Sequence, residues 1–146
     1  MRDNKWLAQR LKSIWEKFFS DIPQKNDVYV RFGRRSRTRL GSIMLDRRSQ
    51  ILTGLGILRL LAKRPHTIIT LNGYFKNSRV PEFVVDATIA HELTHYAHGF
   101  SSPHRRAHYY PHYGGVVRKE LAKRGLLELE RAQKKWCKLH WRDIIE

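Results

Sequence analysis

The 146-residue chain has little cysteine, few acidic residues and no long apolar segment. Its single cysteine, Cys137, allows neither an intramolecular disulfide nor a zinc site of four thiolates, so nothing indicates an oxidising compartment. No apolar run approaches the roughly 20 residues of a membrane-spanning helix, and the charged first ten residues lack the apolar core of a signal peptide. We therefore expect a cytoplasmic protein without a membrane span.

Acidic residues are also few. The chain has 13 Asp and Glu against 29 Lys and Arg, which gives a formal net charge of +16. High net charge can keep a chain disordered, but 41% hydrophobic and 11% aromatic residues supply enough apolar surface for one modest core. We expect one domain over residues 1–146, and the positive field favours encounters with a polyanion such as nucleic acid without specifying one.

The spacing of apolar residues predicts an α+β fold. Helical periodicity marks residues 4–20, 82–98, 116–124 and 126–144, and alternating or β-branched segments predict strands at 28–32, 40–45 and 67–71. An Arg-rich turn at 33–39 separates the first two strands, so we expect a basic hairpin in a short, mostly antiparallel sheet. Gly99 is expected to end the second helix in a left-handed conformation. Residues 51–61 remain open, because glycines interrupt their apolar residues.

The strongest chemical signal is the segment His91-Glu-Leu-Thr-His95, which falls inside a predicted helix. Residues four apart in a helix lie on one face about one turn apart, so two imidazoles can bind one zinc ion. Glu92 would then contact a metal-activated water without binding the metal, which is the general-base position of a zinc peptidase. The segment therefore predicts an enzyme that hydrolyses peptide bonds.

A third zinc ligand must come from outside this segment. The candidates are His104, His108, His112 and Glu120. We favour His112, because it precedes a predicted helix and because the two glycines that follow Tyr113 allow close approach of the backbone to another element. Glu120 would instead complete a site of two histidines and one glutamate. His98 shares the face of the two motif histidines but lies a turn beyond the expected metal position.

At this point the chain resembles a known family. The run from Pro81 to His95, PEFVVDATIAHELTH, is similar to the active-site helix of SprT-like zinc metallopeptidases. Pro111-His112, followed by a predicted helix, resembles the downstream histidine of that family. Residues 40–43 and 68–72 are similar to the two strands that precede its active-site helix, so the resemblance covers about residues 28–125, with flanking helices at 4–20 and 126–144.

The resemblance implies a small zincin-like domain and a complete site. It assigns Zn²⁺ to His91, His95 and His112 and the role of general base to Glu92. It also implies action on proteins bound to DNA, which is associated with the family. The cysteine-rich zinc ribbon that often follows the family's domain cannot form in a chain with one cysteine.

An alternative function follows from residues 31–48, where seven arginines stand against Asp46, a net charge of +6. Five of these arginines are candidates for phosphate contacts: Arg31, Arg34, Arg35, Arg37 and Arg39. Nearby Tyr29 and Phe32 could stack on bases. The alternative is therefore a basic nucleic-acid-binding protein with a structural or vestigial metal site, and a solvated hairpin is the neutral interpretation. Peptidase activity and DNA binding are compatible in one protein. A chain with both would be expected to associate with a nucleoid or nucleus.

Overall fold

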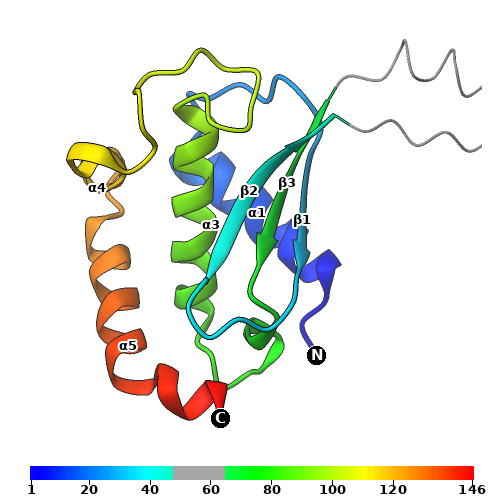
Figure 1. Ribbon diagram of the computed structural model, residues 1–146, viewed down its shortest axis with the longest axis vertical. Coiled ribbons are helices and arrows are strands. Elements are labelled where there is room, and N and C mark those ends of the chain that lie inside the picture. The colour runs from blue at the N-terminus through cyan, green and yellow to red at the C-terminus, as the bar shows by residue number, and fades with distance from the viewer. Residues whose placement is uncertain (48–64) are drawn as a thin grey trace, which may run out of the picture.

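The computed structural model describes residues 1–47 and 65–146. The helices are α1 (Asn4–Phe18), α3 (Glu82–Ala97), α4 (Val116–Lys123) and α5 (Leu127–Ile145), with short 3-10 helices η1 (Gly73–Lys76) and η2 (Tyr113–Gly115). The strands are β1 (Val28–Phe32), β2 (Gly41–Asp46) and β3 (His66–Leu71). This combination confirms the α+β class (Figure 1). Arg48 and the segment 51–61, whose type was open, lie outside the described residues.

The described strands form a mixed sheet in the order β1-β3-β2. β1 runs parallel to β3, and β2 runs antiparallel to it. The predictions of a mostly antiparallel sheet and of a hairpin joining 28–32 to 40–45 are therefore wrong. β3 takes the central place because four of its six residues are buried. The eight residues between β1 and β2 also exceed the two to five of a tight hairpin.

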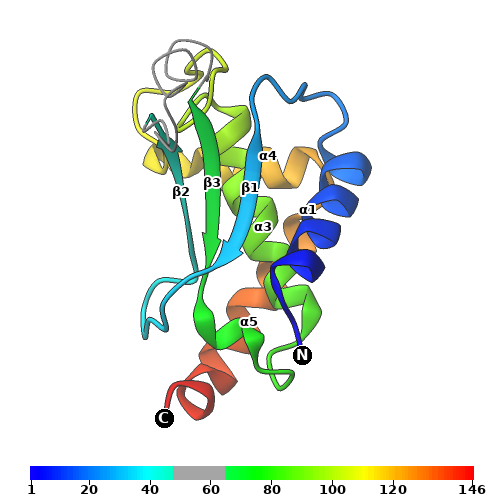
Figure 2. The same cartoon turned by 90° about the vertical axis from the view of Figure 1, so that its right-hand side faces the viewer.

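α3 is the central helix of the molecule. In Figure 1 it lies between the sheet and α5, and Figure 2 shows α3 and α5 behind the sheet. Its exposed surface is consequently small: every residue from 84 to 96 except His91 is buried, and Val84 and Ile89 have no exposed surface. Gly99 follows the helix with φ +81, which confirms the predicted left-handed end. None of the helices in the described ranges has the length and apolar character that a membrane crossing needs.

α1 is tied to α3 by apolar packing and by one ion pair. Leu7, Leu11 and Ile14 are the buried residues of α1, at the spacing of an amphipathic helix. Arg10 Nε donates to Asp86 Oδ1 of α3 at 2.9 Å, and Arg10 Nη2 donates to the other carboxylate oxygen. This two-bond geometry fixes the helices relative to each other and gives Asp86 a structural role.

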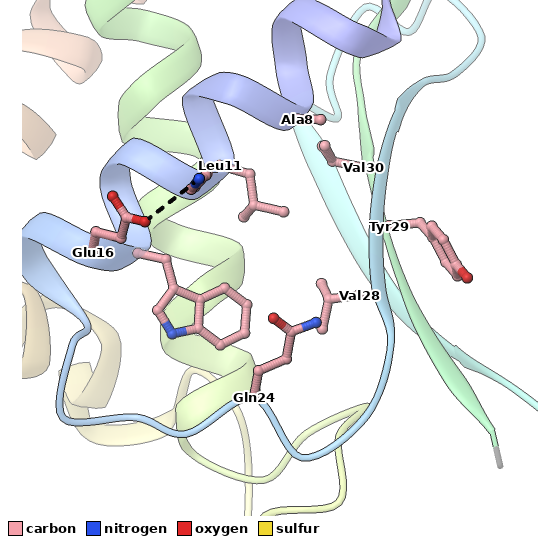
Figure 3. A pocket seen from close by; sticks show the side chains of 9 residues that line it. Ala8, Leu11, Glu16, Gln24, Val28, Tyr29 and Val30 are labelled. Atoms are coloured by element: carbon pink, nitrogen blue, oxygen red, sulfur yellow. Dashed lines mark ion pairs between the residues drawn. The ribbon is translucent and has the colours of Figure 1, made fainter.

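β1 presents alternate residues to the two faces of the sheet. A cavity of about 500 Å³ lies between α1 and β1, and in Figure 3 Val28 and Val30 point toward α1, whereas Tyr29 points away. Phe32 shares the side of Val30, packs against the core, and has the Lys76 ammonium 5.6 Å from its ring centre. Tyr29 and Phe32 therefore face opposite sides of the sheet, so one surface does not present both rings for stacking on bases.

Candidate metal centre

α3 supplies two histidines of a convergent cluster. His91 and His95 lie one turn apart, and their Nε2 atoms are 3.1 Å from each other. His95 is buried and His91 is half-buried. Because the helix is enclosed by the sheet and α5, both rings are held by its packing rather than projecting from a free surface.

The third member of the cluster is His112, at the end of the loop between α3 and α4. Its Nε2 lies 3.3 Å from Nε2 of His91, and its ring is exposed. Gly114 and Gly115 follow with φ +69 and +68, and nothing lies within 4 Å of a Cβ built at either position. These glycines therefore allow a left-handed turn into α4 rather than the predicted close approach to another element.

The three histidines lie close enough to bind a metal ion, since their candidate ligand atoms are all within 4.8 Å of one another. A neutral ring nitrogen either donates one hydrogen or accepts one, so Nε2 of His91 cannot form a good hydrogen bond to both neighbours. Nitrogens bound to a tetrahedral zinc ion at about 2.0–2.1 Å lie about 3.4 Å apart. The observed spacings are near that value, so the donor set fits a transition metal that imidazole ligands favour.

The electrostatic surroundings leave the α3 histidines ready to bind a metal. Burial lowers the pKa of His95 to about 3, with further lowering by His91 and His112. Burial also lowers the pKa of His91 to about 4, and the neighbouring His112 lowers it further. Both rings are therefore neutral at pH 7 and keep a lone pair for a ligand bond.

The side chain of Glu92, on α3, lies next to Gly41, the first residue of β2. A Cβ built on Gly41 would lie 3.0 Å from Glu92 Oε1 and 2.7 Å from Cγ2 of Thr88, so a larger residue at position 41 would force the α3 side chains to move. Glu92 is 5% exposed. Burial raises the pKa of its carboxyl to about 7, and the charge of Arg39 acts in the opposite direction. The carboxyl can therefore exchange a proton near neutral pH.

The other candidates for a third ligand make different contacts. Glu120 Oε2 is 3.7 Å from His98 Nε2, and its Oε1 is 2.9 Å from an Arg124 nitrogen. The Nε2 atom of His104 is 2.7 Å from the carbonyl oxygen of Pro23. The ring of His108 stacks edge-on against His98, with centres 4.6 Å apart. None of the four joins the cluster: Glu120, His104, His108 and His98.

Two polar residues of α5 that sequence reasoning missed face the site helix. Gln133 Nε2 donates to Val84 O at 3.0 Å and to Thr88 Oγ1 at 2.7 Å. The charge of Glu130 raises the pKa of His91 against the larger lowering by burial. Glu130 and Gln133 follow Leu126 at intervals of four and three residues, so they share the core-facing side of the helix. Polar residues at these core-facing positions are the sequence signal that could have identified them.

The segment predicted as an Arg-rich turn is an anchored loop. Asn72 Nδ2 donates to Ser36 O at 2.6 Å and to Arg39 O at 2.7 Å, and Trp141 Nε1 donates to Arg37 O at 2.7 Å. Five arginines of the loop and of β1 are exposed: Arg31, Arg34, Arg35, Arg37 and Arg39. None of these five forms an ion pair with another residue of the described ranges. The backbone is therefore fixed while the positive charges face solvent.

Comparisons of the chain with protein-family models, with curated proteins and with solved structures give no match. The likeness to SprT-like peptidases therefore rests on the sequence motifs alone. The geometry of the histidine cluster and of Glu92 has to support any assignment of chemistry independently.

Proposed function

We propose that the chain is a zinc-dependent metallopeptidase with a small zincin-like domain. The observation that carries the proposal is the convergence of three Nε2 atoms, two of whose separations, 3.1 and 3.3 Å, are close to the spacing that zinc requires. A buried carboxylate on the same helix supports it, because a general base next to three histidine ligands is the arrangement of a hydrolytic rather than a structural zinc site. His91, His95 and His112 would hold the ion.

The chain's own residues divide the chemistry between them. A zinc ion, when bound, supplies a Lewis acid that lowers the pKa of water and polarises a carbonyl group. Glu92 would take the proton of the attacking water and pass it to the leaving nitrogen, since no hydrogen-bond donor of the described residues occupies its carboxylate. The exposed ring of His112 leaves one side of the site open to a peptide.

Three exposed tyrosines lie next to His112 in the sequence and are candidates to stabilise the oxyanion. Tyr109, Tyr110 and Tyr113 are 81%, 57% and 77% exposed. Their rings contact each other, with centres 4.7 and 6.2 Å apart. A hydroxyl group of one of these tyrosines could donate to the developing negative charge of a tetrahedral intermediate.

The proposal is tested with the purified chain. We expect about one zinc ion per chain and cleavage of an unfolded protein substrate such as fluorescently labelled casein. A chelator should remove both the metal and the activity, and added zinc should restore them. A chain that binds zinc fully and cleaves no unfolded protein would contradict the peptidase assignment.

Nucleic-acid binding is the second candidate, because five exposed arginines without acidic partners lie on β1 and on the anchored loop. Phosphate contacts would make affinity for a DNA oligonucleotide fall steeply with salt, with a slope of about −0.9 per neutralised phosphate on a duplex. A response to salt with a slope near zero would exclude this function.

A further inference from the structure

A cationic cavity of about 240 Å³ lies where β2 begins and β3 ends. Its polar lining residues are two arginines, two serines, one threonine and Asn72, and none of its lining residues is acidic: Arg34, Ser36, Arg39, Leu40, Gly41, Ser42, Thr70, Leu71 and Asn72. Two arginines beside several hydroxyl groups form a donor-rich hollow. Its chemistry suits an anion, above all a planar carboxylate that a guanidinium can bind through two hydrogen bonds.

Buried hydrogen bonds hold the walls of this cavity. Asn72 is 4% exposed, and its Nδ2 donates to the backbone carbonyls of Ser36 and Arg39. Its Oδ1 accepts from the backbone nitrogens of Ser36 at 3.3 Å and Tyr74 at 3.0 Å. Ser36 Oγ accepts from the backbone nitrogen of Arg39 at 3.0 Å. The two arginines are therefore carried on a fixed backbone, which lowers the entropy lost on binding an anion.

The cavity borders the proposed general base. Gly41 lines the cavity, and a Cβ at this position would lie 3.0 Å from Glu92 Oε1. β2 is an edge strand of the described sheet. A peptide that runs along this edge with its scissile bond near Glu92 would place a neighbouring side chain near the cavity that Gly41 lines.

We propose that this cavity is a carboxylate-binding subsite, which takes an Asp or Glu side chain of the peptide substrate and makes the enzyme select acidic segments. The inference rests on the proposed peptidase function, because it places the peptide beside Glu92. A nucleic-acid strand is the weaker occupant. It would follow the exposed row that includes Arg31 and Arg37, which do not line the cavity, rather than enter a hollow of side-chain size.

Peptide binding to the Glu92→Gln variant tests the inference without requiring hydrolysis. The probes are fluorescent peptides of one extended sequence that differ only by a Glu or a Gln, with the position of that residue moved along the peptide. Anisotropy measured at constant salt should show tighter binding of the Glu peptide by about tenfold at one position. Equal affinity of Glu and Gln peptides at every position would overturn the subsite.

Matched variants separate the cavity from the general positive field. In the Glu92→Gln background, Arg34→Gln/Arg39→Gln should abolish the preference for Glu. Arg35→Gln/Arg37→Gln removes the same charge at two loop arginines that do not line the cavity and should keep it. An equal loss of the preference for Glu in both double variants would show a diffuse polyanion surface and overturn the inference. The same conclusion would follow if a DNA oligonucleotide competed with the peptide and both double variants weakened that competition equally. Arg39→Glu adds a complementary test, because it should reverse the preference toward a peptide with Lys at that position.

Failure of this inference is distinguishable from failure of the proposed function. A chain that binds zinc and cleaves unfolded protein without preferring Glu peptides would keep the peptidase assignment and remove the subsite. A chain that binds Glu peptides through Arg34 and Arg39 but cleaves nothing would keep the carboxylate site and remove the peptidase assignment.

Discussion

Two groups of histidines lie near the carboxyl end of α3, and they differ in what their ring nitrogens face. We call them the metal group (His91, His95 and His112) and the anchor group (His98, His104 and His108). In the metal group, Nε2 atoms face one another at 3.1 and 3.3 Å. In the anchor group, His98 lies 3.7 Å from the Glu120 carboxylate, and His104 is 2.7 Å from a backbone carbonyl oxygen.

The comparison of the two groups shows that the contacts of each histidine, and not its place in the sequence, determine its role. The metal group takes two histidines from α3 and one from the following loop, whereas the anchor group takes His98, which directly follows α3, and two histidines of the loop. The anchor group ties that loop to other elements: His104 contacts Pro23 before β1, and His98 contacts Glu120 of α4. These contacts place the loop so that His112 reaches α3. The anchor group is therefore structural support for the metal group.

Replacing the glutamate beside each group should give the largest contrast. We expect Glu92→Gln to keep its metal and lose peptidase activity by at least about 100-fold, because the amide cannot accept the proton of the attacking water. Glu120→Gln should change activity by only a few fold, since that carboxylate contacts His98 and Arg124. Metal content and initial rates measured on both variants check this. A Glu92→Gln variant with undiminished rates would refute the assigned base.

Removing one histidine from each group should separate their affinities for metal. His112→Ala should weaken zinc binding by more than about 100-fold, because ligand loss exceeds the 10- to 100-fold effect of changing a supporting residue. His108→Ala, a change in the same loop, should leave stoichiometric zinc. Competition with a zinc-chelating dye measures both affinities. If His108→Ala or Glu120→Ala alone released the metal, the division between the groups would fail.

Much of this arrangement could be predicted from the sequence, where local rules apply. The apolar spacing in α1 and the left-handed Gly99 after α3 were readable because helices depend on neighbours three or four residues away. His91 and His95 were paired by the same rule. These expectations required no knowledge of distant contacts, and the helices lie within a few residues of the predicted ranges.

The parts that sequence reasoning missed depend on distant contacts. The insertion of β3 between β1 and β2 is a long-range pairing, which the eight-residue segment between them does not reveal. The position of His112 beside α3 follows from the path of a loop without periodicity. The approach of Glu92 to Gly41 likewise joins residues about fifty positions apart. Residue types identified these candidates, but only the fold decides which of them meet.

A smaller effect should follow from loosening the anchor group. Arg124 has a side chain only 9% exposed and donates to Phe18 O at 2.9 Å, in addition to its bonds with Glu120 and Asp21. Arg124→Met should lower the free energy of unfolding by about 2 kcal/mol, because the partly buried Phe18 carbonyl and Glu120 carboxylate lose their donor. Arg118→Met on the exposed face of α4 is the control. Urea unfolding of the zinc-loaded proteins measures both, and equal effects would show that the network does not support the fold.

The smallest expected effect is a pH dependence of stability that belongs to the anchor group. Burial lowers the pKa of His98, and the neighbouring His108 and Arg124 lower this pKa further. The carboxylate of Glu120 acts in the opposite direction and raises it. The unfolded chain then binds more protons than the fold, so the contribution of neutral His98 is complete above its ordinary pKa of about 6.5 and is lost as pH falls below it.

This sign can be measured with His98→Gln, a variant that cannot gain the proton. Its deficit in unfolding free energy relative to the unmodified chain should shrink between pH 7.5 and 5.5, because only the unmodified chain loses the His98 contribution. Urea midpoints of zinc-loaded proteins at several pH values give the difference. A deficit that grows on acidification would mean that His98 is protonated in the fold and held by Glu120, which would make the anchor group a charge pair rather than a neutral support.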